Sequence, residues 1–164
     1  MIPATAPSRQ TSPTTASQDS IVGRARVVLA LATPTFREWT SDMFAPVHAD
    51  TTAPTWRAAP LVGDFDGDGA PDVAFTGRDS AGVLILAVLS HRGQPIIAPV
   101  TTERELAVGI DLRRSRLALA VGDFQSRRRE MIDVAVWDAD GREMTLTARF
   151  IYEKGRFSVL VEGE

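Results

Sequence analysis

The sequence predicts a mainly β fold that consists of two related antiparallel units and a short N-terminal helix. Short apolar runs alternate with clusters of glycine, proline and aspartate, which is typical of strands joined by turns. The tetrapeptide Val-Gly-Asp-Phe at 62–65 returns at 121–124, and Asp-Val-Ala at 72–74 returns at 133–135. A repeat period near sixty residues indicates one four-stranded unit per repeat.

Composition limits the classes of protein that this chain can represent. Its 164 residues suffice for one domain, alone or with a tail, and its 44% hydrophobic content allows a buried core. The pI near 5.4 provides no general attraction to nucleic acid. The absence of cysteine excludes a disulfide framework and a cysteine-based zinc or redox site. No apolar run reaches the ~18 residues that a membrane helix requires.

The N-terminal part combines a tail with a helix. Residues 1–19 are rich in Ser, Thr, Pro and Ala, so a disordered tail is expected there. A single β-rich domain is expected over 20–164. Its first element is a helix from Ser20 to about Ala32, ended by Pro34. One face of this helix is apolar and comprises Ile21, Ala25, Val28, Leu29 and Ala32.

An aromatic and proline-rich segment completes residues 20–60. Four prolines interrupt 33–60 and prevent long regular elements there. The large aromatic side chains of this segment are expected to pack it onto a sheet, and they are Phe36, Trp39, Phe44 and Trp56. An exposed Trp39 or Trp56 could instead form a binding patch, but core packing is the more frequent role of tryptophan.

The rest of the chain reads as a series of strands. The apolar run 83–89 is continuous, which favours a strand buried on both faces. Segment 143–152 alternates, with Met144, Leu146, Ala148 and Phe150 on one face of a half-buried strand. The other expected strands are 60–63, 72–76, 95–100, 131–137 and 157–161, and a further strand could lie near 106–110. Turns are expected at 77–82 and 138–141.

The loop 64–72 concentrates negative charge at the spacing of metal ligands. Aspartates occupy its first, third, fifth and ninth positions, and Gly69 at the sixth allows a sharp turn. Because these carboxylates repel one another, we expect the loop to need a cation to stay folded, and the alternative is a solvated acidic turn without a metal. Calcium suits the loop, since Ca²⁺ takes six to eight oxygen ligands in flexible geometry. An EF-hand would need Glu at position twelve and flanking helices, whereas Phe75 and strands are found here.

The stretch Val62–Ala74 resembles the core of an FG-GAP or VCBS repeat. In that family the loop is a calcium site inside one blade of a β-propeller, as in integrin α-subunits and many secreted bacterial proteins. The resemblance implies four side-chain ligands and one carbonyl ligand, which are Asp64, Asp66, Asp68, Asp72 and the carbonyl of Ala70. It also implies two propeller-blade-like units, an intact repeat over 61–119 and a degenerate repeat over 120–164. Two such units do not close a propeller.

The second loop has lost the ligand pattern. Gln125 stands at its third position and Arg127 at its fifth, so it offers no cation site. An arginine could instead place positive charge beside Asp123 or Asp133. Arg127–Arg129 are interpreted as a solvated loop, with a partner-binding patch as the alternative.

The leading functional hypothesis is a non-enzymatic, calcium-binding, secreted or periplasmic domain whose surface contacts a protein or glycan. We expect a monomer without nucleic-acid binding or a membrane span. A calcium-dependent hydrolase or lyase is one alternative, and a carbohydrate-binding module using Trp39, Trp56 or Trp137 is another. His48 and His91 lack the spacing of a catalytic triad or zinc site, and both are expected on the surface or in loops.

Overall fold

The computed structural model describes residues 15–39, 60–102, 116–123, 130–137, 140 and 144–160. These residues form one α-helix, nine strands and a short 3₁₀ turn. In chain order they are α1 (Thr15–Ala32), β1 (Arg37–Glu38), β2 (Leu61–Gly63), β3 (Asp72–Asp79), β4 (Gly82–Leu89), η2 (His91–Gly93), β5 (Ile96–Thr102), β6 (Arg116–Asp123), β7 (Glu130–Trp137), β8 (Met144–Glu153) and β9 (Arg156–Leu160).

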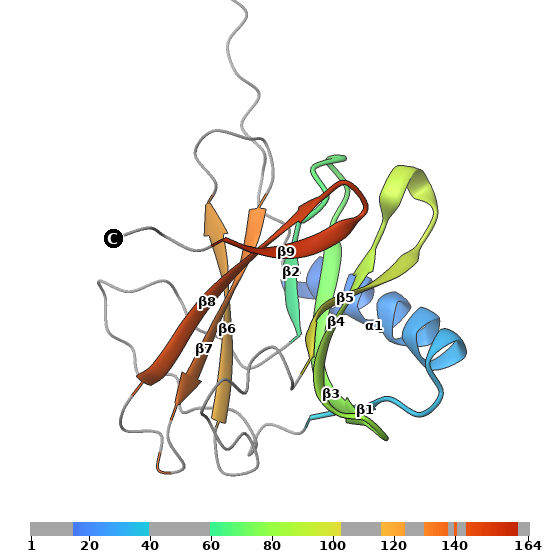
Figure 1. Ribbon diagram of the computed structural model, residues 1–164. Helices are drawn as coiled ribbons and strands as arrows, with labels where there is room; N and C mark the ends of the chain where they lie inside the picture. The colour runs from blue at the N-terminus through green and yellow to red at the C-terminus, as the bar shows by residue number, and fades with distance from the viewer. Residues whose placement is uncertain are drawn as a thin grey trace, which may run out of the picture.

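The strands form two antiparallel sheets, one for each predicted unit. The first sheet has the order β1-β3-β4-β5, and β2 also pairs with β3. The second sheet is a meander with the order β6-β7-β8-β9. Figure 1 shows α1 along one side of the first sheet and the second sheet, coloured orange to red, beside it. The predicted mainly β class, with two antiparallel units and a short helix, is confirmed.

The first sheet is covered on both faces because its strands alternate between two apolar clusters. Ile85, Ala87 and Leu89 of β4 join side chains of the second sheet in one cluster. Leu86 and Val88 of the same strand join the helix in the other. The prediction that this apolar run forms a strand buried on both faces is therefore confirmed over 85–89.

The helix begins earlier than the sequence analysis places it. It starts at Thr15, within the stretch expected to be a disordered tail, and ends at Ala32 as expected. No proline lies between Pro13 and Pro34, so nothing interrupts the helical hydrogen bonds over this stretch. Packing on the first sheet stabilises the helix, since Val22, Ala25 and Leu29 are buried. Residues 1–14 of the expected tail lie outside the described residues.

The turn expected at 77–82 is also shorter than predicted. β3 continues to Asp79, and only Ser80 and Ala81 connect it to β4. The Asp79 carboxylate accepts a hydrogen bond from the amide of Ala81 at 2.7 Å. Gly77 is inside the strand, where the ring of Phe36 and the carbonyl of Arg37 occupy the space that a Cβ would need. This glycine therefore marks a close approach of two segments and not a turn.

The aromatic segment is described only as far as Trp39. Phe36 and Trp39 are both buried, and Trp39 belongs to the cluster between the sheets. The expected core role of Trp39 is therefore confirmed. Several expected features lie outside the described residues, namely residues 40–59 with Trp56, the strand near 106–110, the Arg127–Arg129 loop and most of the turn at 138–141.

The two units differ in register at their repeated motifs. In the first unit Gly63 pairs with Asp72, so the aspartate marks the end of the loop. In the second unit Gly122 pairs with Met131, and Asp133 pairs with Ala120 inside the ladder. The distance from the first aspartate of the motif to the last is two residues longer in the second repeat (123 to 133) than in the first (64 to 72), and a longer strand pairing accommodates the difference.

The helix-to-sheet cluster provides a test of the layer arrangement. Leu29 is 4% exposed and Leu31 is 80% exposed in the same helix. We expect Leu29→Ala to lower the free energy of unfolding by about 2–5 kcal/mol, because truncation leaves a cavity. Leu31→Ala should change it by less than about 0.5 kcal/mol. Urea denaturation of both variants measures the difference, and equal losses would contradict this packing of α1.

Candidate metal centre

The loop between β2 and β3 brings three of the predicted ligands together. One oxygen each from Asp64, Asp66 and Asp72 lies within 4.8 Å of the other two, a group that could hold a metal ion. Asp68 is exposed and does not belong to this group, and Ala70 is half-buried in the same loop.

The loop folds because its aspartates bind backbone amides of the same segment. Asp64 accepts hydrogen bonds from the amides of Gly67 at 2.9 Å and Gly69 at 3.1 Å. Asp66 accepts from the amide of Asp68 at 3.0 Å, which is a local Asx turn. Gly67 and Gly69 have φ of 78° and 88°, a left-handed conformation that glycine adopts without steric cost. The predicted sharp turn at Gly69 is thus confirmed.

Asp72 is the most deeply buried residue of the group. The residue is fully buried, and its Oδ2 accepts hydrogen bonds from the amides of Phe65 at 2.8 Å and Asp66 at 3.3 Å. Its Oδ1 accepts from the amide of Ser90 at 2.7 Å. The pKa of Asp72 is raised to about 7, chiefly by burial and also by the charge of Asp66, while the amide hydrogen bonds oppose this rise. A charged Asp72 is therefore costly unless a cation lies nearby.

Phe65 attaches the loop to the core. Its side chain is fully buried in the cluster between the sheets. A Cβ at Gly63 would lie 2.7 Å from Cε1 of this ring, so only glycine fits there. In the first unit, Gly63 of the Val-Gly-Asp-Phe motif thus leaves room, Phe65 anchors the loop in the core, and Asp64 contributes a carboxylate to the group.

Three successive residues after β4 reach across to the loop. The amide of Ser90 donates to Asp72, and Nδ1 of His91 lies 2.7 Å from Oδ2 of Asp66. The amide of Arg92 donates to Oδ2 of Asp68 at 2.7 Å. The sequence predicts that His91 lies on the surface or in a loop, but it does not predict this contact with Asp66. The available signal was the β3–β4 pairing, because joining 72–76 to 83–89 puts residues 90–92 beside the Asp loop.

The second unit also contributes to the site, through Glu130 at the start of β7. Its Oε2 accepts a hydrogen bond from the amide of Asp64 at 2.7 Å. Its own amide donates to the carbonyl of Asp64 at 2.9 Å. A Cβ at Gly63 would lie 2.6 Å from this Oε2, so the glycine makes room for the carboxylate as well as for Phe65. No pattern in the sequence indicated this contact between units.

Asp133, which corresponds to Asp72 in the second repeat, is buried beside an arginine. It is 4% exposed, and its Oδ1 lies 3.4 Å from Nε of Arg149. Its Oδ2 lies 2.8 Å from where a Cβ of Gly122 would be. Burial raises the pKa of Asp133, and the charge of Arg149 opposes that rise. The arginine beside Asp133 thus comes from β8, whereas Arg127–Arg129, which were expected to supply this charge, lie outside the described residues.

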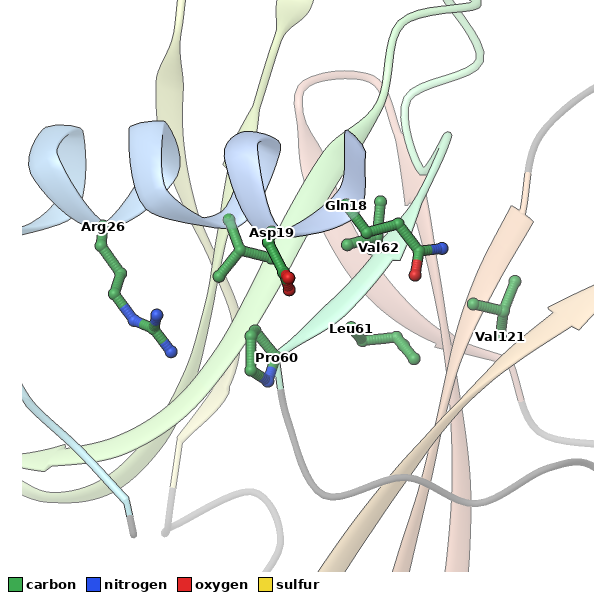
Figure 2. A pocket seen from close by; sticks show the side chains of 8 residues that line it. Gln18, Asp19, Arg26, Pro60, Leu61, Val62 and Val121 are labelled. Atoms are coloured by element: carbon green, nitrogen blue, oxygen red, sulfur yellow. The ribbon is translucent and has the colours of Figure 1, made fainter. Parts of the chain in front are cut away.

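A cavity lies away from the carboxylate group. Its volume is about 460 Å³, and it opens between α1, β2 and β6. Figure 2 shows its lining, which comprises Gln18, Asp19, Val22, Arg26, Pro60, Leu61, Val62 and Val121. The guanidinium of Arg26 already forms two hydrogen bonds with Glu38, at 2.7 and 2.8 Å. None of the loop aspartates lines this cavity.

Comparison of the chain with family models, curated proteins and solved structures finds no match. Among the described residues, α1 is the one α-helix, and it lacks the combination of length and apolar character needed to cross a membrane.

The contact between Glu130 and the loop can be tested by mutation. Glu130→Ala removes the acceptor for a half-buried amide, and we expect a loss of about 1–3 kcal/mol in the free energy of unfolding. Glu130→Gln keeps an acceptor oxygen and should recover most of that loss. Chemical denaturation of the two variants and the wild type gives the values. A Glu130→Ala protein as stable as the wild type would show that the contact contributes nothing.

The raised pKa of Asp133 predicts that the free energy of unfolding decreases as the pH rises. Because its pKa is raised in the folded state, the unfolded chain ionises first as the pH rises from about 4, the ordinary pKa of aspartate. The wild type should therefore lose stability relative to Asp133→Asn up to the raised pKa, after which the difference should stay constant. Denaturation between pH 3.5 and pH 8 measures the difference, and a difference independent of pH would contradict the burial of this charge.

Proposed function

We propose that this chain is a non-enzymatic, calcium-binding domain in which the ion holds the loop of the first unit. The observation that carries the proposal is the close group of Asp64, Asp66 and Asp72, with Asp72 fully buried. Three carboxylates at this separation repel one another, and burial strengthens the repulsion by lowering the local dielectric constant. A divalent cation offsets this cost.

The donor chemistry favours calcium over other metals. The group offers only carboxylate oxygens, which suit hard cations, whereas zinc and copper favour nitrogen or sulfur ligands. Calcium accepts six to eight oxygens in variable geometry, and magnesium requires a near-ideal octahedron. The resemblance to FG-GAP/VCBS repeats adds Asp68 and the carbonyl of Ala70 as ligands. Both residues belong to the same loop, and Asp68 remains accessible to an ion because it is exposed.

The proposed role of the ion is structural. The loop joins β2 to β3, is anchored by Phe65 in the core and is bonded to the second unit through Glu130. An ion at this junction would stiffen the contact between the two units. A dissociation constant of about 10⁻⁴ to 10⁻³ M, as in extracellular calcium modules, would keep the site loaded in a secreted or periplasmic protein. The surface of this monomeric domain would then serve a protein or glycan partner.

The alternatives receive less support. A carbohydrate-binding surface built from tryptophans loses Trp39, because its side chain lies in the core. A calcium-dependent hydrolase or lyase would need a substrate cleft beside the ion. The cavity between α1, β2 and β6 has none of the loop aspartates in its lining.

Thermal denaturation with and without calcium tests the proposed site. At a calcium concentration 100-fold above the dissociation constant, binding to the native state adds about 2.7 kcal/mol of stability. For a chain of this length that corresponds to a rise in Tm of about 5–10 °C over the chelator-treated protein. Magnesium at the same concentration should give a smaller rise.

A matched pair of variants tests whether the calcium-dependent rise in Tm comes from the loop. Asp66→Asn keeps side-chain hydrogen-bonding groups but removes one anionic ligand, so the calcium-dependent rise should be largely lost. Asp79→Asn makes the same chemical change in the β3–β4 turn, where the side chain caps Ala81, and should leave the rise unchanged. Absence of a rise in the wild type, or an equal rise in Asp66→Asn, would rule out this calcium site.

A further inference from the structure

The turn after β4 holds the loop through three contacts, of which one depends on the identity of a side chain. Ser90 and Arg92 donate through their backbone amides, which almost any residue would supply. His91 donates through its ring, 2.7 Å from Oδ2 of Asp66. The chemical identity of the residue therefore matters most at position 91.

The proton in this contact can be assigned from the partner. An ionised carboxylate only accepts hydrogen bonds, so Nδ1 of His91 must carry the hydrogen. That nitrogen is consequently engaged with Asp66 and not free to bind a metal. His91 also stands outside the group of oxygens that could share an ion. His91 therefore acts on the metal site indirectly, through its contact with Asp66.

The carboxylate of Asp66 is held on both oxygens. Its side chain has no exposed surface, while the side chain of His91 is 41% exposed. The amide of Asp68 binds Oδ1 at 3.0 Å, and His91 binds Oδ2. Two donors on opposite oxygens fix the plane of the carboxylate. Because each oxygen has a second lone pair, an ion can still be bound in the fixed orientation.

The backbone of the turn is shaped to bring His91 to the loop. Arg92 has φ of 50° and Gly93 has φ of 77°, both in the left-handed region. For a non-glycine residue this conformation is strained and persists only when its surroundings hold it. The backbone amides of Arg92 and Gln94, which donate to Asp68 and to the carbonyl of His91, provide that hold whatever their side chains are.

We propose that His91 is a positioning residue of the calcium site, which presents Asp66 to the ion in a fixed orientation. The proposal rests on the calcium-binding function above and adds a residue outside the Asp loop to it. Without the ring donor, Asp66 gains rotational freedom that must be lost again on binding. Removal of such outer partners lowers metal affinity about 10- to 100-fold in known metal sites.

Calcium titration calorimetry of four proteins tests the proposal, at a temperature where circular dichroism shows each of them folded. His91→Leu removes the donor, and its dissociation constant should rise about 10-fold or more. His91→Asn retains a side-chain N–H near the position of Nδ1 and should stay within about threefold of the wild type. Gln94→Leu places the same leucine on an exposed position of the same turn and should bind like the wild type.

The outcomes separate this proposal from the calcium function itself. A wild type that binds no calcium overturns both. Calcium binding by the wild type with an equal affinity for His91→Leu overturns only the positioning role. An equal loss in His91→Leu and His91→Asn also overturns it, because a general disturbance of the turn would then explain the effect. Loss in His91→Leu with recovery in His91→Asn supports it.

Discussion

The burial of Asp72 is the constraint on which the loop and its surroundings depend. A carboxylate without exposed surface must be satisfied by donors, and its oxygens accept from amides of the loop and of the turn after β4. The bond from Ser90 joins segments that are eighteen residues apart. The same burial makes the charge expensive, which gives a cation a reason to bind beside it. The fold thus prepares the site, and the proposed ion completes it.

The second unit supports the first in place of repeating its chemistry. Its own aspartate, Asp133, is buried in a strand, and the guanidinium of Arg149 lies beside it as an internal cation. Its strand β7 supplies Glu130, which bonds the loop of the first unit from the other side. The second unit, which lacks the ligand pattern, therefore has a structural role, because its Glu130 holds Asp64 in the loop of the first unit.

Much of the fold was accessible from local pattern. The continuous apolar run of β4 predicted a strand covered on both faces, because a half-exposed strand would alternate. Helical spacing predicted α1, although not its start at Thr15, since the residues that extend it carry no apolar signal of their own. The turn glycine was identified correctly at Gly69. Gly77 was wrongly assigned to a turn, because the residue that it contacts, Phe36, belongs to a distant segment of the sequence.

The sequence by itself determined the class of the fold, its two units and the loop with its aspartates. Each of these depends on the spacing of residues that are near one another in the chain. Tertiary structure alone decided which carboxylates meet, since Asp68 turns to the amide of Arg92 while Asp64, Asp66 and Asp72 converge. It also brought His91 and Glu130 to the loop. These contacts depend on strand pairing and on the packing of two sheets, and local sequence spacing does not specify how the sheets pack.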